Sequence, residues 1–329
     1  MTVIDFHAHI VPKEYPRCPA GINEPAWPSM TRVDDQSSQM FVGDKPFRIF
    51  ESFYWDVDER IAQMDKNGVA MEVLSPLPEL LSYWLDPQAT VVLTDFMNGF
   101  VGDMVRRAPD RFQGLGAVAL QDVDKAIAQL DAVKNEHGLK GVLLASHVNG
   151  TSLADPKFHP FFAKLEELGL VALIHGYKPS LDRLLGSPLM APVIGVPHEN
   201  TSVVGSFIMM DILGKFPDLK LIFSHGGGGI GAIIDRFDMV WKTFEVMRVN
   251  GDVPPKEYAK RFFYDTVTFS PEYLGYLVRA FGADRFVAGT DGPTEIGQKD
   301  LPGFLGQAGL SERESKLIMQ ENALRLLSL

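Results

Sequence analysis

The sequence contains one cysteine, Cys18, among its 329 residues, so no disulfide can form within the chain. Chains without disulfides are typical of reducing compartments, which predicts a cytoplasmic protein. No apolar run approaches the roughly 18 residues of a membrane span, and no basic, apolar leader opens the sequence, so neither a span nor a signal peptide is expected. Positive charge is scarce as well. The net charge of −11, from 31 Lys and Arg against 42 Asp and Glu, argues against nucleic acid or a membrane surface as a partner.

The recurring pattern along the chain is a short β-branched run, a turn and a longer helical stretch, which predicts βα units and a parallel sheet. Strands are expected at 3–9, 70–75, 112–120, 141–145, 171–175, 220–225, 262–268 and 285–291. Helices are expected at 56–66, 87–107, 123–134, 160–168, 202–216, 231–247 and 271–281, with a final amphipathic segment at 311–327. This is the count of an α/β fold of the (β/α)8 TIM-barrel type, expected to form one domain over residues 1–329.

Two stretches depart from this pattern, and both follow strands that end in histidine. Residues 11–53 contain several prolines and scattered aromatic residues but no helical period, and a structureless loop of that length is uncommon. We therefore expect a small insertion after the first strand that caps the mouth of the barrel. A second polar, proline-rich stretch runs from 177 to 197, in a position that suits a substrate-facing loop.

Histidine and aspartate residues mark the ends of four predicted strands. His7 and His9 are two residues apart on the first strand, so both side chains point to the same face. His175, His225 and Asp291 end the fifth, sixth and eighth strands. Active sites of TIM barrels form at the carboxyl ends of the strands. Three histidines and a carboxylate suit a divalent ion such as zinc with room left for water, so the pattern predicts a metal site.

Each of these residues alone has an ordinary structural explanation, such as a hydrogen-bonded histidine or a turn at Asp291. Their coincidence on four strands favours the metal site. Only one ion is expected, because the fourth strand ends Leu144-Ala145-Ser146 without a lysine or glutamate that could bridge two ions. The glycine run 226–229 lacks the Gly-Lys-Ser/Thr ending of a phosphate loop, and we expect it to leave room for a ligand or for water on the metal.

Short motifs distributed over nearly the whole chain form a further pattern: Ile4-Asp5-Phe6-His7-Ala8-His9, Phe47-Arg48, Trp55-Asp56, Ser82-Tyr83-Trp84, Pro109-Asp110-Arg111-Phe112, His225-Gly226-Gly227-Gly228 and Gly289-Thr290-Asp291. In these motifs the chain resembles the amidohydrolase superfamily, and within it the branch of 2-amino-3-carboxymuconate-6-semialdehyde decarboxylase. The resemblance implies one metal ion, zinc or alternatively manganese, and no organic cofactor. It implies the metal ligands His7, His9, His175 and Asp291.

The resemblance also assigns the remaining roles at the site. His225 would be an acid–base group that does not bind the metal, with Asp291 as a second catalytic residue. Arg48 matches an arginine that grips the substrate carboxylate, and Arg236 matches a second family arginine. A guanidinium suits this task because it binds a carboxylate through two hydrogen bonds.

The residues after the fifth and eighth strands differ from that branch. His175-Gly176-Tyr177 stands where the decarboxylases carry His-Pro-Trp, and Asp291-Gly292-Pro293 where they carry Asp-Tyr-Pro. We therefore expect the residues that line the substrate-binding site to differ from those of that branch. The candidate contacts with the substrate are Tyr177, Trp84 and His198.

The expected reaction is a non-oxidative, metal-dependent decarboxylation of a small unsaturated or aromatic carboxylic acid in the breakdown of aromatic compounds. The same site could instead hydrolyse a C–N, C–O or C–C bond, or hydrate an unsaturated acid, through hydroxide on the metal. A metal-binding protein without activity is a third interpretation, which would require a broken ligand set. Family resemblance also implies a homodimer, for which residues 233–248, with Trp241, Phe244 and Met247, are the candidate contact.

Overall fold

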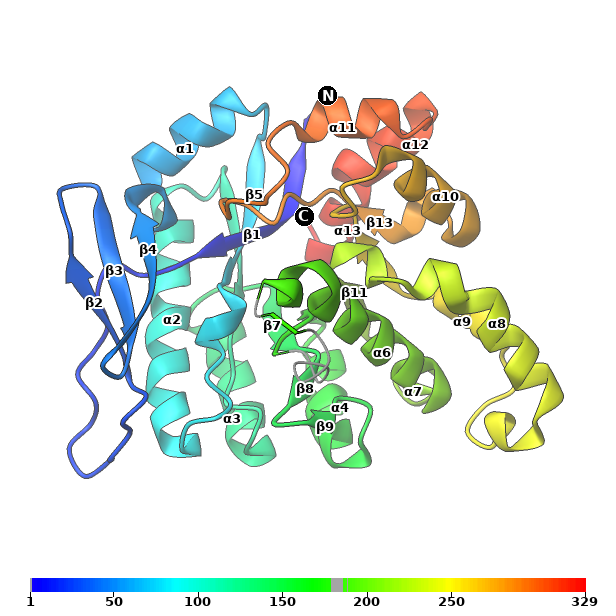
Figure 1. The fold of residues 1–329 in the computed structure, drawn as a ribbon, viewed down its shortest axis with the longest axis horizontal. Coiled ribbons are helices and arrows are strands. Elements are labelled where there is room, and N and C mark those ends of the chain that lie inside the picture. Colours follow the sequence, from blue (N-terminus) through cyan, green and yellow to red (C-terminus); the bar gives the residue numbers. More distant parts are fainter. Residues whose placement is uncertain (1, 179–185, 188) are drawn as a thin grey trace.

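The computed structural model describes residues 2–178, 186–187 and 189–329, and its central element is an eight-stranded parallel sheet (Figure 1). The strands follow one another in chain order: β1 (Ile4–Ile10), β5 (Met71–Pro76), β6 (Phe112–Gly116), β7 (Gly141–Ala145), β10 (Val171–His175), β11 (Lys220–Phe223), β12 (Phe263–Asp265) and β13 (Phe286–Val287). Backbone hydrogen bonds from Phe6 to Ala288 (2.8 Å) and from His9 to Gly292 (2.6 Å) bring the last strand back to the first. The predicted TIM barrel is confirmed.

Several strands are shorter than the sequence predicted. β6 ends at Gly116, β12 at Asp265 and β13 at Val287, before the expected ends at 120, 268 and 291. The residues beyond these ends leave the ladder and form the loops at the carboxyl edge of the barrel. β6, β7 and β10 are buried along their whole length, because one face of each strand fills the barrel and the other packs under helices.

Helices surround the barrel: α1 (Val57–Lys66), α2 (Pro87–Arg107), α3 (Val123–Asn135), α4 (His159–Glu167), α6 (Val196–Met209), α7 (Ile212–Lys215), α8 (Ile230–Thr243), α9 (Pro255–Ala259), α10 (Pro271–Phe281), α11 (Leu301–Gln307), α12 (Glu312–Lys316) and α13 (Asn322–Leu327). α2 and α10 have the predicted bounds, since each begins with proline after a capping Asp86 or Ser270. α6 begins before the expected residue 202, and it is separated from α7 at Asp211, whose φ is 49°.

The insertion between β1 and α1 contains a three-stranded antiparallel sheet, where the sequence analysis expected a small insertion without assigning strands to it. Its strands are β2 (Pro28–Arg32), β3 (Ser37–Val42) and β4 (Lys45–Glu51), and they lie at the left edge of Figure 1. Met40 and Phe50 are its buried apolar side chains, and the Phe50 ring contacts Tyr54 edge-on at 4.9 Å. The role of this sheet as a cap and the single-domain organisation remain predictions.

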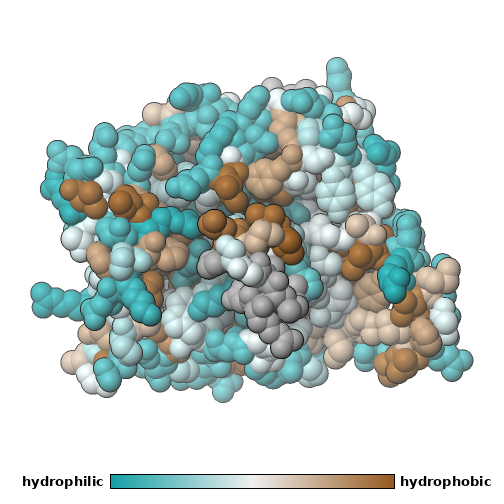
Figure 2. All heavy atoms as spheres, in the orientation of Figure 1, coloured by the Kyte–Doolittle hydropathy of each residue, from teal (hydrophilic) through white to brown (hydrophobic). Residues whose placement is uncertain are grey.

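Large apolar side chains are exposed at one end of the molecule, on α8 and the segment that follows it. They are Ile233, Met239, Phe244, Val246, Val249 and Val253. Figure 2 shows apolar surface at the lower right, where α8 lies in Figure 1. Among the described residues, no helix is long and apolar enough to cross a membrane.

Candidate metal centre

Two histidines of β1 begin the site. His7 and His9 lie on the same face of the strand, and their Nε2 atoms are 3.0 Å apart. Both side chains are fully buried. Both Nε2 atoms therefore point to one place inside the barrel.

Three other strands bring their terminal residues to the same point. Asp291 Oδ1 lies 3.1 Å from His9 Nε2 and 3.3 Å from His7 Nε2. His175, the last residue of β10, faces His225, which follows β11, with 3.1 Å between their Nε2 atoms. One ligand atom each of His7, His175, His225 and Asp291 lies within 4.8 Å of the others. The structure therefore brings all five predicted residues together, with His9 joined through its contacts to His7 and Asp291.

The spacing of these atoms fits a divalent ion. Zinc binds imidazole nitrogen and carboxylate oxygen at about 2.0–2.2 Å, which places neighbouring ligand atoms about 3 Å apart, as they are here. The four residues whose ligand atoms all lie within 4.8 Å of one another are His7, His175, His225 and Asp291. His9 Nε2 contacts two of them, His7 and Asp291, so His9 remains the predicted ligand and His225 the predicted acid–base group.

The outer ring nitrogens of the three proposed histidine ligands are all engaged. His7 Nδ1 lies 2.6 Å from Asp265 Oδ2, and His175 Nδ1 lies 2.7 Å from the Gly176 carbonyl. His9 Nδ1 lies within 3.3 Å of the Pro76 carbonyl and 3.2 Å of Ser75 Oγ. Partners of this kind fix each ring so that the other nitrogen, Nε2, faces the ion.

Asp265 is a site residue that the sequence analysis missed. It ends β12, is fully buried, and also accepts hydrogen bonds from the backbone N–H groups of Gly226 and Val267 at 3.0 Å. A signal was present, since the carboxylate lies within the predicted strand 262–268. Alternation along a barrel strand indicates which side chains point into the barrel, and Asp265 is one of them.

The electrostatics of the centre favour positive charge. Burial disfavours the charged form of His7, but its bond to Asp265 and the charges of Asp291 and Asp265 outweigh this and raise the pKa of His7 to about 9. Burial lowers the pKa of His9, His175 and His225. Burial also opposes ionisation of Asp291, yet its contact with His9 and the charge of His7 hold its pKa well below the usual range. A divalent ion would satisfy the same attraction that favours the protonated form of His7.

Two residues of the centre have left-handed backbone conformations. The φ angles are 52° at His225 and 62° at Asp291, values that only a constrained environment holds in non-glycine residues. The glycines after His225 make this turn possible: a Cβ at Gly228 (φ 65°) would lie 2.0 Å from the Pro197 carbonyl, and one at Gly227 would lie 2.8 Å from the Tyr264 ring. The glycine run therefore accommodates the first turn of α6 and the barrel core, and its expected role beside a ligand stays a prediction.

The candidate substrate contacts divide into two groups. Tyr177 and Trp84 come together, with stacked rings 6.1 Å apart. His198 lies on the first turn of α6, and its ring is 3.5 Å from Ser202 Oγ. The neighbouring residue Glu199 is buried. Arg48 is exposed on β4 beside the rings of Phe47 and Phe50, and Arg236 is exposed on α8. Among the described residues, no hydrogen bond or ion pair joins His198, Arg48 or Arg236 to the metal ligands.

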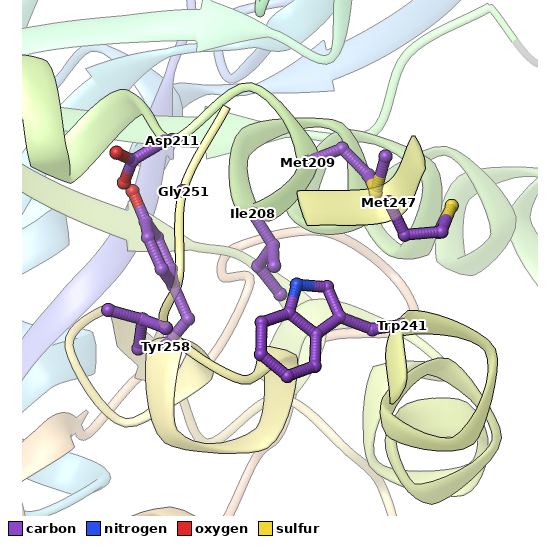
Figure 3. Close-up of a pocket in the computed structure, with 8 residues that line it drawn as sticks. Ile208, Met209, Asp211, Trp241, Met247, Gly251 and Tyr258 are labelled. Atoms are coloured by element: carbon purple, nitrogen blue, oxygen red, sulfur yellow. The ribbon is translucent and has the colours of Figure 1, made fainter. Parts of the chain in front are cut away.

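A hollow between α6, α8 and α9 is separate from this centre (Figure 3). Trp241 and Met247 line it together with Ile208 and Met209 of α6. Two of the three apolar residues proposed as dimer contacts therefore pack against their own chain. Phe244 remains 55% exposed.

Known proteins resemble this chain over its full length. The Amidohydrolase family matches residues 4–329. The 2-amino-3-carboxymuconate-6-semialdehyde decarboxylase of Dictyostelium discoideum is 30% identical over 329 residues, which cover 99% of this chain and 91% of the relative. The crystal structure of 5-carboxyvanillate decarboxylase from Sphingomonas paucimobilis is 26% identical, covers 100% of this chain and 99% of its own, and has a TM-score of 0.84.

A dihydroxybenzoic acid decarboxylase from Polaromonas sp. JS666, solved with manganese and 2-nitroresorcinol, shares the fold. Its TM-score is 0.76 at 23% identity, over 83% of this chain and 86% of its own. The predicted resemblance is confirmed, together with the expectation of a metal-dependent enzyme that is a carboxy-lyase or a hydrolase. With its barrel, its histidine and aspartate centre and a family match from residue 4 to residue 329, the chain belongs to the amidohydrolase family.

Proposed function

We propose that this protein removes the carboxylate of a small aromatic or unsaturated acid as CO2, without oxidation. The observation that carries the proposal is the convergence of His7, His9, His175 and Asp291 on one point, with His225 beside them. The curated relative from Dictyostelium discoideum and the solved relative from Sphingomonas paucimobilis are both named as decarboxylases. Their likeness over the full chain supports a lyase over a hydrolase or hydratase.

His7, His9, His175 and Asp291 would hold one divalent ion, zinc or manganese. When bound, the ion supplies Lewis-acid chemistry, anchoring oxygen atoms of the acid and stabilising developing negative charge. Imidazole and carboxylate ligands suit both metals, and the manganese in the Polaromonas relative supports the second choice. Asp265 would keep the His7 ring oriented for this purpose.

Loss of CO2 leaves the electron pair of the broken C–C bond on the former carboxyl-bearing carbon, which then takes a proton. An aromatic or unsaturated framework spreads this charge, so no organic cofactor is required. His225 is half-buried, and burial lowers its pKa, so its imidazole is neutral at neutral pH. We assign to it the transfer of a proton from the acid or from water to that carbon, with Asp291 as the second catalytic residue.

We propose that Arg48 and Arg236 bind the substrate carboxylate. Tyr177 and Trp84 are the residues proposed to line the substrate-binding site. Arg236 is exposed on α8, together with the apolar Ile233 and Met239. These exposed side chains support a homodimer in which α8 faces its partner and Arg236 contributes to the site of the second copy. The cytoplasmic location expected from the lone cysteine stays a prediction.

The test is product analysis with metal-loaded protein and a panel of aromatic and unsaturated acids, including 2,6-dihydroxybenzoate and 5-carboxyvanillate. Release of CO2 with a product that has lost one carboxylate supports the proposal. Two products without CO2 would identify a hydrolase, and a product heavier by one water would identify a hydratase. Either of the last two results would replace the proposal.

A further inference from the structure

Three side chains form a stack at the carboxyl end of β10. The Nζ atom of Lys178 lies 3.5 Å from the centre of the Trp84 ring and 5.3 Å from that of Tyr177. The two rings are themselves stacked, with 17° between their planes. Lys178 comes three residues after the proposed ligand His175, which ends β10, so the stack belongs to the loops at the carboxyl end of the barrel.

The hairpin of β8 (His147–Val148) and β9 (Thr151–Ser152) fixes this stack. His147 Nε2–H donates to the carbonyl of Lys178 at 3.1 Å, while its Nδ1 accepts from the Gly150 N–H at 3.1 Å. Asn149 Nδ2 donates to the carbonyl of Tyr83, the residue before Trp84, at 2.6 Å. One hairpin therefore holds the backbone on both sides of the stack, so its side chains are prepositioned.

The ammonium group in this stack has an aromatic partner but no ion pair within the described part of the chain. Partial burial lowers the pKa of Lys178, and the charge that acts on it is the carboxylate of Glu79. Glu79, on the short helix η2 (Pro78–Leu80), acts on Tyr177 and on the metal ligand His9 as well. The charge of Glu79 therefore acts both on the stack and on a proposed metal ligand.

We infer that Lys178 binds a second acidic group of the substrate, a carboxylate or an ionised phenol, and thereby sets a preference for acids that carry one. The inference rests on the proposed function, because it assumes that the first carboxylate is bound at the metal centre. Lys178 is exposed, so an anion can reach its ammonium group, and a hydrogen bond between two ionised groups is stronger than one between neutral groups. The negative charge of Glu79 repels such an anion. We therefore expect Glu79 to weaken the preference for a second acidic group that Lys178 strengthens.

The test compares binding of isophthalate, which has two carboxylates, with benzoate, which has one, to zinc-loaded protein by titration calorimetry. In Lys178→Met we expect affinity for isophthalate to fall about tenfold, the size of one charge-assisted hydrogen bond, with benzoate nearly unchanged. Lys178→Arg should keep most of the preference for isophthalate over benzoate. Glu79→Gln should make that preference stronger than in wild type.

Lys157→Met is the matched control, since Lys157 also lies over an aromatic ring, Phe158 at 4.8 Å, on another part of the surface. It should leave both affinities unchanged. An unchanged ratio of the two affinities in Lys178→Met overturns the inference. Equal weakening of both ligands overturns it too, because that result indicates a structural role.

Binding also separates this inference from the proposed function. If no acid is decarboxylated but the isophthalate preference depends on Lys178, the proposed reaction fails while the binding role stands. If acids are decarboxylated with a preference that is the same in Lys178→Met, the role of Lys178 fails alone.

Discussion

The Nδ1 atom of His7 lies 2.6 Å from the carboxylate of Asp265, and both side chains are fully buried. This contact joins β1 to β12 and leaves His7 Nε2 free to face the other ligands. Asp265 also accepts from the N–H of Gly226, next to His225. One carboxylate therefore orients a proposed ligand and the turn that carries the proposed acid–base group.

Asp265→Asn should weaken metal binding about 10- to 100-fold, because the amide cannot hold the His7 ring with the same charge and tautomer. Chelator competition with zinc gives the affinity. Asp284→Asn is the control, since Asp284 is partly exposed beside Arg285 and remote in sequence from the ligands. Equal affinity in Asp265→Asn and wild type would show that this contact does not support the metal.

Asp291→Ala should remove most of the metal from protein purified without added metal, and His7→Ala combined with His9→Ala should do the same. Each change deletes proposed ligand atoms that lie 3.0 to 3.3 Å from one another. Elemental analysis should find about one equivalent in wild type, as for a single site. Wild-type protein that holds no metal and takes up neither zinc nor manganese would revive the interpretation of a protein without metal chemistry.

His225→Gln should keep the metal and lose about 100-fold or more in turnover, the usual contribution of an acid–base group. The residue touches the ligand cluster through His175 but is outside the proposed set. Metal content and turnover are measured on the same preparation. Loss of metal together with activity would instead place His225 among the ligands, in the position that we give to His9.

Metal binding should release protons, and its affinity should rise with pH. Despite the opposing effect of burial, Asp265 and Asp291 raise the pKa of His7 to about 9, so metal-free His7 is protonated at neutral pH. Binding near pH 7.5 then displaces about one proton, and the gain in affinity with pH should level off above about pH 9. Calorimetry of zinc binding in buffers of different ionisation enthalpy measures the release. Binding without proton release near pH 7.5 would contradict a protonated His7.

Gly228→Ala should destabilise the fold by about 2 kcal/mol or more, from overpacking and a left-handed backbone. Its φ is 65°, and the new Cβ would lie 2.0 Å from the Pro197 carbonyl. Gly306→Ala on α11 is the control, because nothing lies within 4 Å of the position its new methyl group would take and no left-handed φ constrains it. Thermal unfolding of both variants tests this, and equal midpoints would show that the turn after His225 tolerates a side chain.

Local sequence signals located the eight barrel strands and the longer helices, although several of their ends differ from the prediction. β7 and β10 are short apolar runs with clear turns on either side, and they were predicted with the observed bounds. α2 was predicted to the residue by its initial proline. The β2–β4 sheet was missed, because β2 and β4 are exposed along most of their length and the apolar Phe47 and Ile49 of β4 face solvent instead of a core.

The sequence by itself determined the identity of the ligand-type residues at the strand ends, since residue type and position in a βα repeat are local properties. The tertiary structure alone decided which groups meet: His7 with Asp265 across β1 and β12, and Lys178 with Trp84 across the ends of β10 and the segment before α2. It also decided that His198 turns toward Ser202. Such contacts depend on barrel closure and loop conformation, which bring together residues that are far apart along the chain and that no local pattern encodes.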